Sequence, residues 1–436
     1  MKFSGLIVAV IVLAALVGTL YWSNHHKPAE TAQVSADTPP KILSINESEI
    51  RKLELKKKDS DDTVLTKDNS GKWQIDGPKP LPADASAVSG VLSALSSLTA
   101  ERLVDEKASD LSRYGLAKPG MEVGLVEKDN KTHTLLIGDD TPTNSGTYAK
   151  LAADSRVFTI VTYTKNSIEK GVNDLRDKRL ITAEADKISR LDLRAGKQEI
   201  EFGRNKDQWE IVKPQPLRAD GFAVDDLVRK ITEAKMDLGP TDDAKKAAFA
   251  FASGSAVVVA KVTTEAGTQT LEIHKNKDDY YAKSSVVDGI YKVGNDVAQG
   301  LDKKLDDFRN KKLFDFGFAD PDKIELHGSK VCYLTRGGQS WWSGDGKKLD
   351  AAGADAVVEK VRDLQASKFA DSGFGSPMLE AIVTSNGGKR VEKVQISKSG
   401  DRYLAKRENE PALYVIDATA ISDLQKAATE LKPEKP

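Results

Sequence analysis

A chain of 436 residues is too long for one ordinary hydrophobic core and suits about three domains. Its 39% hydrophobic and 30% charged residues exclude a disordered chain, and the formal charge of -1 excludes the basic field with which proteins hold nucleic acid. The one cysteine, Cys332, excludes an internal disulfide and a multi-cysteine zinc site, and its apolar, strand-like neighbours predict a buried, unreactive thiol.

The N-terminus begins with Lys2 and continues as an uninterrupted apolar run over residues 5–22. As a helix this run would span about 27 Å, near the thickness of a bilayer core. Tyr21 and Trp22 close it where interfacial aromatic residues are expected. We therefore predict a single-pass anchor over residues 1–23 in a bacterial cytoplasmic membrane, with the N-terminus in the cytoplasm. The exported remainder would be periplasmic if two membranes are present.

A cleaved signal peptide is the alternative interpretation, because it has the same charged start and apolar middle. Tyr21 and Trp22 disfavour it, since they stand where the small residues of a cleavage site are expected. Residues 24–41 are rich in Pro, Ala, Thr and Ser without an apolar period, which predicts a flexible linker. His25 and His26 within it are expected to be solvated rather than metal-bound.

The exported part contains one module three times. The segment from Trp73 to Asp84 recurs with identical spacing from Trp209 to Asp220, and a degraded copy begins at Trp341. The repeat period is about 133 residues, a normal domain size. We place the modules at residues 42–181, 182–314 and 315–431, with the last one shorter and followed by a tail over 432–436.

Each module is predicted to be α+β, an antiparallel sheet covered by one main helix. In the first copy, residues 50–55, 63–66 and 73–75 alternate as strands do, and a second strand group follows at 121–127, 132–137, 148–151 and 157–161. Between the groups, Asp84 is a suitable N-cap for a helix that carries Val88, Leu92, Leu95 and Leu98 on one face. The fold class is therefore an N-terminal transmembrane helix followed by three tandem α+β modules.

The tryptophans of the repeat separate into two kinds. Trp73, Trp209 and Trp341 are expected to pack the main helix against the sheet. Trp342 follows Trp341 directly, and adjacent strand residues point to opposite faces. Trp342 is therefore expected to point outward or into a groove, which makes it a candidate partner-contact residue, although a local packing role is the alternative.

A search for catalytic motifs finds none of the phosphate-binding loops, nucleophile elbows or zinc-binding helices that have sequence signatures. Ser167 and Lys170 match a short S-x-x-K pattern but lack its companion motifs, so we interpret the match as accidental. His133, His274 and His327 are one per module and are not expected to form a metal site. No catalytic residue and no cofactor are predicted.

Basic residues recur near the end of the first two modules: Arg176 and Arg179 correspond to Arg309 and Lys312. They are expected to cap a helix C-terminus or to pair with Asp174 and Asp307. A patch for an anionic partner is the alternative.

Three motifs of the first copy carry a family resemblance: residues 114–119 (YGLAKP), residues 137–142 (IGDDTP) and residues 175–180 (LRDKRL). With these motifs the chain resembles domain of unknown function 4340, more weakly in the second copy and faintly in the third, which lacks the last motif. The resemblance implies an N-terminal membrane segment, repeated β-rich domains and genes beside gliding-motility-type ABC transport components. It supplies no catalytic residues.

The leading functional hypothesis is a non-enzymatic accessory or scaffold protein that works with the subunits of a membrane transport complex. A module protein that binds glycan or another envelope ligand, with Trp342 at a cleft, is the second. A hydrolase with a site assembled between modules is the third. Nucleic acid is not an expected partner.

Overall fold

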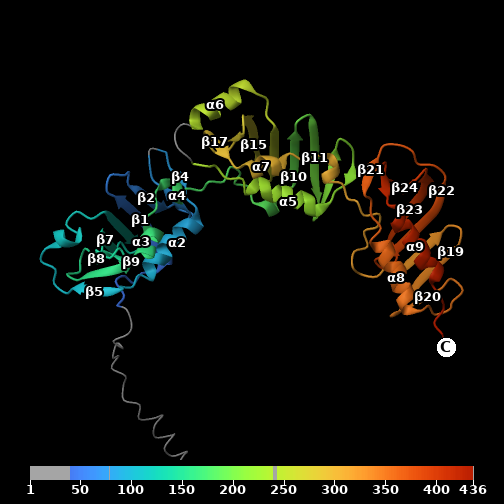
Figure 1. Ribbon diagram of the computed structural model, residues 1–436, viewed down its shortest axis with the longest axis horizontal. Helices are drawn as coiled ribbons and strands as arrows, with labels where there is room; N and C mark the ends of the chain where they lie inside the picture. The colour runs from blue at the N-terminus through green and yellow to red at the C-terminus, as the bar shows by residue number, and fades with distance from the viewer. Residues whose placement is uncertain (1–39, 78, 239–242, 436) are drawn as a thin grey trace, which may run out of the picture. The chain divides into compact units, whose positions relative to one another are not determined.

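The computed structural model describes residues 40–77, 79–238 and 243–435 (Figure 1). The predicted anchor and residues 24–39 of the predicted linker lie outside these ranges. Within them, no helix combines the length and the apolar character needed to cross a bilayer. The chain divides into two compact units, one ending at Asp177 and one beginning at Lys178. The first unit holds one antiparallel sheet and the second holds two, which confirms the predicted series of three sheet modules.

The first module is a nine-stranded sheet with the order β4-β3-β2-β1-β6-β7-β8-β9-β5. Its elements in chain order are η1 (Glu47–Glu49), β1 (Ile50–Lys57), β2 (Thr63–Lys67), β3 (Trp73–Ile75), β4 (Leu81–Pro82), α2 (Ala85–Ser96), β5 (Arg102–Asp105), η2 (Leu111–Tyr114), β6 (Met121–Glu127), β7 (Thr132–Asp140), β8 (Gly146–Leu151), β9 (Val157–Val161), α3 (Thr162–Ile168) and α4 (Val172–Leu175). Along β1, buried Leu53 and Leu55 alternate with Lys52, Glu54 and Lys56, so one face of the sheet meets the core and the other is charged.

Helix α2 begins where the sequence predicts. The carboxylate of Asp84 accepts hydrogen bonds from the backbone N–H groups of Ser86 (2.9 Å) and Ala87 (3.1 Å), as an N-cap residue does. Val88, Leu92 and Leu95 are buried in the core of the module. Asp220 and Asp350 cap the main helices of the other two modules in the same way.

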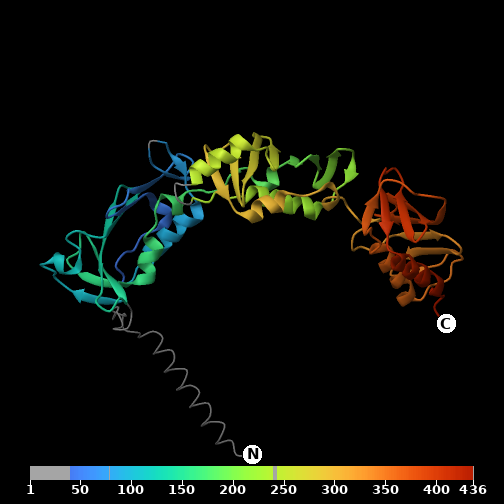
Figure 2. The ribbon, with the colours of Figure 1, turned by 45° about the horizontal axis from the view of Figure 1, so that its top comes forward.

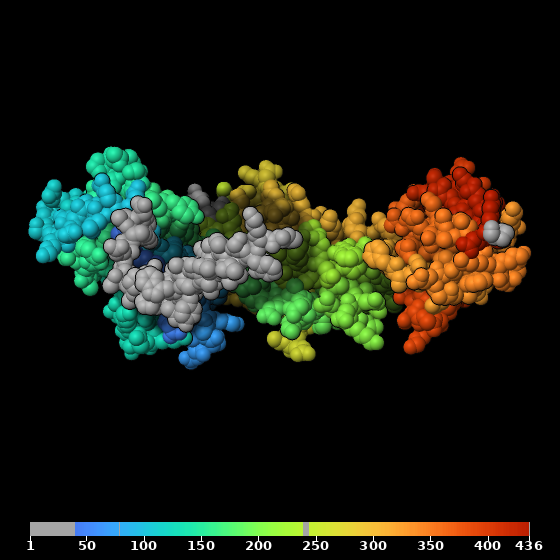
Figure 3. All heavy atoms as spheres, turned by 90° about the horizontal axis from the view of Figure 1, so that it is seen from below, coloured from blue at the N-terminus to red at the C-terminus, as the bar shows by residue number. Residues whose placement is uncertain are grey.

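The second module is an eight-stranded sheet with the order β13-β12-β11-β10-β14-β15-β16-β17. Its elements are η3 (Ala185–Lys187), β10 (Arg190–Ala195), β11 (Gln198–Asn205), β12 (Gln208–Lys213), β13 (Leu217–Arg218), α5 (Gly221–Thr232), α6 (Asp243–Ser253), β14 (Val258–Thr264), β15 (Gly267–Asn276), β16 (Asp279–Ser284), β17 (Ile290–Val293), α7 (Asn295–Leu301) and η4 (Leu305–Asp307). Helix α6 lies on the opposite face of the sheet from α5 and α7 (Figures 1 and 2) and forms a small separate core with Tyr281. Figure 3, seen from below in Figure 1, shows the light-green atoms of α5 at the surface.

The third module is again eight-stranded, with the order β20-β19-β18-β22-β23-β24-β25-β21. Its elements are β18 (Lys323–His327), β19 (Val331–Gly337), β20 (Ser340–Trp342), α8 (Ala351–Arg362), β21 (Lys368–Ala370), β22 (Pro377–Ser385), β23 (Arg390–Ser399), β24 (Arg402–Arg407), β25 (Leu413–Ile416) and α9 (Ala418–Glu430). Val357 and Val361 of α8 and Ile421 and Leu424 of α9 share the core with the sheet.

Each module ends with a short extended segment that pairs beside the N-cap of its own main helix. The backbone N–H of Asp84 donates to Leu175 (2.8 Å), and that of Asp220 donates to Phe308 (2.7 Å). In the third module, Asp350 donates to Lys432 (3.0 Å). Residues 432–434, which the sequence predicts to be a tail, therefore take the place of the closing motif that the third copy lacks.

The residues that follow this segment belong to the next module. Leu180 and Ile181 are buried in the core of the second module, and Leu313 and Phe314 in that of the third. The repeat motifs instead predict each pair at the end of the preceding module. The cores therefore put the first buried residues of a module two positions earlier than the repeat motifs suggest.

The turn that follows η2 in the first module meets the irregular end of β7. A Cβ on Gly138 would lie 2.1 Å from the carbonyl oxygen of Tyr114, and a Cβ on Gly115 would lie 2.4 Å from the Asp139 carboxylate. Gly115 also has a positive φ of 66°. Both glycines are therefore required by the close approach of residues 114–116 to residues 138–139.

Candidate functional site

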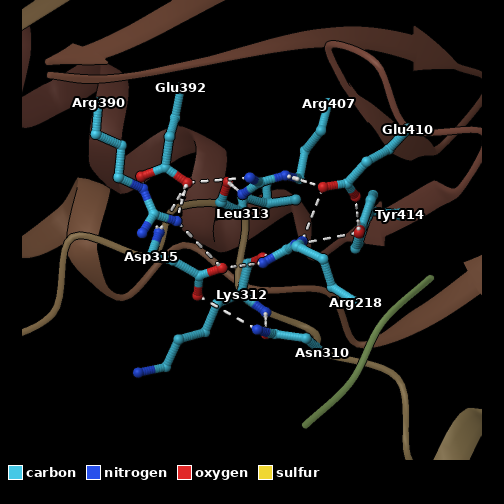
Figure 4. Close-up of polar contacts among 10 residues, drawn as sticks. All are labelled: Arg218, Asn310, Lys312, Leu313, Asp315, Arg390, Glu392, Arg407, Glu410 and Tyr414. Atoms are coloured by element: carbon cyan, nitrogen blue, oxygen red, sulfur yellow. Dashed lines mark hydrogen bonds and ion pairs between the residues drawn. The ribbon is translucent and has the colours of Figure 1, made fainter. Parts of the chain in front are cut away.

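The backbone that enters the third module meets a group of charged side chains, of which Glu392 and Arg407 are buried. The N–H of Leu313 donates to Leu364 (3.0 Å), and the N–H of Ala366 donates to Lys311 (2.8 Å), so this segment pairs with the chain just after α8. Its remaining polar groups meet side chains of β23 and β24. We call the six charged residues gathered here, with Tyr414, the junction cluster: Arg218, Asp315, Arg390, Glu392, Arg407, Glu410 and Tyr414 (Figure 4).

At the centre of the junction cluster, Glu392 and Arg407 form an ion pair at 3.0 Å, with side chains only 4% and 10% exposed. The guanidinium of Arg407 donates to the carbonyl oxygen of Leu313, and the Glu392 carboxylate accepts from the N–H of Asp315 at 3.1 Å. Arg390 lies 3.2 Å from Glu392 and 3.7 Å from Asp315. The pair therefore satisfies backbone groups that the entering segment would otherwise bury without partners.

Arg218 joins the cluster from β13 of the second module. Its guanidinium pairs with Asp315, donates to the carbonyl oxygen of Lys312 and to the Tyr414 hydroxyl (3.2 Å), and has Nε 2.8 Å from Glu410 Oε1. That Nε–H is buried and lacks hydrogen-bond geometry toward any acceptor, so the contact with Glu410 is a charge pair. Arg218 thus links the second module to the strands of the third (Figure 4).

The charges of the junction cluster balance, because three guanidinium groups face three carboxylates. Burial lowers the pKa of Arg218, but Tyr414, Asp315 and Glu410 outweigh that effect and hold it above its usual value. Burial raises the pKa of Tyr414, which keeps a neutral hydroxyl that donates to Glu410 at 2.7 Å. Each charged group already has an oppositely charged partner, so the cluster is suited to fixing an arrangement rather than to chemistry.

In the second module, neutral side chains form hydrogen bonds with the equivalent backbone groups. Ser284 Oγ donates to the carbonyl oxygen of Leu180, and Gln269 Oε1 accepts from the N–H of Thr182 at 2.9 Å. The strand registers make these positions equivalent, since Ala282 and Ala405 each lie opposite an isoleucine of the preceding strand. Ser284 and Arg407 each stand two residues after these alanines, so they occupy equivalent positions. Gln269 and Glu392 each stand four residues before the opposing isoleucine and are equivalent in the same way. The charged pair is therefore specific to the entry of the third module.

The family comparison follows the same repeat. The family described as Domain of unknown function (DUF4340) matches residues 73–211 and again residues 209–381. The chain belongs to this family. Each match begins at the tryptophan before a main helix and ends within the next module, so the DUF4340 unit includes the segment that links two sheets.

Other comparisons add little to this assignment. No curated protein matches the DUF4340 chain. A DNA polymerase sliding clamp from Pseudomonas aeruginosa is 8% identical over 86% of this chain and 93% of that one, with a TM-score of 0.15. The DNA polymerase III subunit beta from the same organism is 8% identical over 88% and 93%, with a TM-score of 0.14. Such low scores carry no structural argument.

The basic residues singled out in the DUF4340 sequence have different surroundings. Arg309 lies 3.4 Å above the ring of Phe369 and pairs with Asp306 at 3.1 Å. Of the two expected roles, an ion pair is present, but with Asp306 in place of Asp307, whose carboxylate accepts from the N–H of Lys304. Lys312 offers its carbonyl oxygen to Arg218, while its exposed side chain points away from the junction cluster (Figure 4).

The two basic residues of the first linking segment stand at the cut between the units. Arg176 is half-buried, occupies the C-cap position of α4 and pairs with Ala83 in an isolated bridge. Arg179 is exposed and forms the equivalent bridge with Lys235 of the second module. Neither bridge brings these arginines to the junction cluster.

The predicted orientation of the paired tryptophans is confirmed. Trp341 is 5% exposed, whereas its neighbour Trp342 is 39% exposed on the other face of β20. A Cβ on Gly337 would lie 2.7 Å from the Trp342 indole nitrogen, so the ring rests on the bare backbone of β19. Trp209 is 4% exposed and its indole N–H donates to Asp225 of α5 at 2.8 Å, which attaches the main helix to the sheet. Trp73 is half-buried against the core of the first module.

The three histidines of the described residues lie in separate modules of the DUF4340 chain. His133 bonds Glu127 at 2.7 Å, and His274 is buried between Ala250 and Glu272. His327 lies beside Glu325 at 3.4 Å. In the part of the chain that the structure describes, no group of three or more His, Cys, Asp or Glu residues could hold a metal ion.

The remaining sequence candidates are also placed. Ser167 donates to the carbonyl oxygen of Tyr163 on its own helix, and it lines a different cavity from Lys170, so the two do not converge. Cys332 is buried as predicted, and burial raises its pKa to about 11. A thiol with so high a pKa is almost entirely protonated at neutral pH.

Sequence reasoning missed the junction cluster. One signal was present, since Arg218 stands where the first copy has Pro82 within an otherwise matching motif. A second signal was also present, because Glu392 and Arg407 are charged residues on the strand faces that otherwise bury Val394 and Ala405.

Proposed function

We propose that this DUF4340 chain is a non-enzymatic scaffold protein of the bacterial envelope. In this proposal residues 5–22 hold it in the cytoplasmic membrane, and its exported modules bind subunits of a membrane transport complex. The transport partner comes from the gene neighbourhood that the family resemblance implies. The observation that carries the scaffold role is the junction cluster.

Buried charges are costly, because each loses its hydration. Replacing such a network with apolar residues is often neutral or stabilising, so its presence is best explained by the single arrangement that it specifies. Glu392 and Arg407 could have been neutral, as Gln269 and Ser284 are at the equivalent place. A protein that presents binding surfaces at a defined spacing gains from such a constraint.

Two surface residues are the proposed partner contacts on the second unit. Trp342 offers a large amphipathic ring on an edge strand, and aromatic residues of this kind are enriched in protein interfaces. Lys312 offers an exposed ammonium group close to the junction cluster, with no ion-pair partner among the residues described. Neither side chain contributes to a core, so both can be changed without unfolding a module.

The test is crosslinking and mild-detergent co-purification of the full-length protein from its native membrane. A chain without residues 1–23 is the control for anchoring, and Trp342→Ala with Lys312→Glu tests the proposed contacts. Recovery of a transporter permease or ATPase with the full-length chain, reduced in the double variant, supports the proposal. Recovery of the protein without any membrane partner would count against it.

A further inference from the structure

A cavity of about 340 Å³ opens on the first module, between the end of α2, the residues that follow it and the start of α3. Its floor includes buried Leu98 and Ala100. Its polar lining consists of five hydroxyl-bearing side chains and one carboxylate: Ser97, Thr99, Tyr163, Thr164, Ser167 and Glu101. No lysine or arginine lines it, so an anionic ligand would meet no opposite charge there.

Four of the six polar side chains that line this cavity are available, whereas the hydroxyls of Ser97 and Ser167 each donate to a backbone carbonyl oxygen of their own helix. Within the described ranges, the side chains of Thr99, Thr164 and Glu101 have no hydrogen-bond or ion-pair partner. The Ser167 hydroxyl donates to Tyr163 of the same helix, which leaves its oxygen as an acceptor. Tyr163 is 81% exposed, although a tyrosine ring would normally bury most of its apolar surface. The cavity thus combines an aromatic face with several uncommitted hydroxyl groups.

The same place in the other two modules has different chemistry. Isolated bridges at Thr99, Lys235 and Gln365 mark equivalent positions after the three main helices. Two residues before these, Ser97 corresponds to Glu233 and Asp363. At these two positions the first module therefore has the neutral residues Ser97 and Thr99, whereas the second has the charged residues Glu233 and Lys235.

The aromatic residue is also specific to the first module. The strand registers align Ile160 with Val293 and Ile416, and the third residue beyond each is Tyr163, Asp296 or Thr419. Only the first copy therefore places a ring beside the cavity. The hydroxyl-rich lining and the ring therefore occur together in the first module.

We propose that this cavity binds a saccharide. A sugar ring presents hydroxyl groups around its rim and an apolar C–H face, which matches hydroxyl partners around an exposed tyrosine. The Glu101 carboxylate would accept a hydrogen bond from a sugar hydroxyl or an acetamido N–H. The volume lies at the small end of ligand sites and suits one or two sugar units. This site does not depend on the scaffold proposal, because it uses the first module alone.

The test is calorimetric titration of the full-length protein in detergent with N,N′-diacetylchitobiose and, separately, maltose. Tyr163→Ala removes the exposed ring with little effect on the core, and Thr99→Lys installs the residue of the second module. Phe318→Ala is the matched control, because this ring is 97% exposed in the third module. We expect saturable binding of at least one disaccharide, weakened about tenfold or more by Tyr163→Ala and by Thr99→Lys, and unchanged by Phe318→Ala.

Two results would overturn the proposal. One is the absence of saturable binding of either disaccharide at millimolar concentration, with folding checked by circular dichroism. The other is binding that survives Tyr163→Ala and Thr99→Lys unchanged, or that Trp342→Ala abolishes instead, since it would place the saccharide elsewhere. Co-purification with transport subunits is a separate measurement, so failure of the saccharide site leaves the scaffold proposal standing.

Discussion

Arg218 Nε lies 2.8 Å from Glu410 Oε1, although Arg218 belongs to the second module and Glu410 to the third. The same guanidinium pairs with Asp315 of the segment between them. A side chain of one module is therefore held by two carboxylates of the next. This relationship makes the junction cluster the part of the molecule most open to direct test.

Arg218→Ala should destabilise the second unit. It leaves Asp315 and Glu410 without their common cation, and breaking a largely buried ion pair costs about 3–5 kcal/mol, which partial exposure of these side chains reduces to about 1–3 kcal/mol. Urea unfolding of the full-length protein would measure the change. Arg229→Ala is the control, because its 56% exposed side chain pairs at the surface and its loss should change the unfolding free energy much less. Equal effects of the two variants would contradict the role of Arg218.

Glu392→Gln and Arg407→Ser install the neutral residues that the second module uses. Each single change leaves one buried charge without its main partner and should cost about 3 kcal/mol. The double variant should cost less than the sum of the singles by about 1 kcal/mol or more, because neither charge then remains unpaired. A double-mutant cycle of unfolding free energies measures this coupling. Strict additivity would show that the two residues act separately.

The adjacent tryptophans should respond in opposite ways to truncation. Trp341→Ala removes a buried ring from the core of the third module and should cost about 3–5 kcal/mol. Trp342→Ala removes a ring that is 39% exposed and should cost about 1 kcal/mol or less. Thermal unfolding of both variants checks the prediction. A larger loss from Trp342→Ala would mean that the faces of β20 are assigned the wrong way round.

Gly138→Ala should destabilise the first module by about 1–3 kcal/mol, because its Cβ would lie 2.1 Å from the Tyr114 carbonyl oxygen. Gly90→Ala makes the same chemical change inside α2 where no atom lies within 4 Å, and should stabilise by about 0.5–1 kcal/mol. Chemical unfolding of both variants gives the comparison. Changes of the same sign in the free energy of unfolding would contradict the close approach of residues 114–116 to residues 138–139.

The Cys332 thiol should react slowly in the folded protein. Burial raises its pKa from 9.0 to about 11, so at pH 8 the thiolate fraction falls about 100-fold relative to the unfolded chain. Reaction with a disulfide reagent, with and without urea, measures this ratio. Because the folded pKa is the higher one, the contribution of the thiol to stability is complete below pH 9 and is lost as the pH rises toward 11. That loss should be absent in Cys332→Val, and equal pH profiles for both proteins would refute it.

Several elements were accessible from the sequence because their cause is local. The Asp84 cap, the apolar face of α2 and the opposite orientation of Trp341 and Trp342 follow from hydrogen-bonding preference and from the periods of helix and strand. Repetition strengthened each inference, since a motif that recurs at the same spacing predicts the same element again. Module ends were less accessible, because Leu180 and Ile181 follow one sheet in sequence and pack in the next.

The sequence by itself determined that this protein is a series of α+β modules, since the patterns of apolar residues that build each core are written within each copy. Tertiary structure alone decided which polar residues meet. Arg218, Asp315 and Glu410 come from different strands and a linking segment, and their attraction depends on distances that only the packing of sheets sets. The hydroxyl-lined cavity depends in the same way on α3 returning beside the end of α2. Local periodicity encodes cores, whereas sites made by distant segments exist only after those cores have formed.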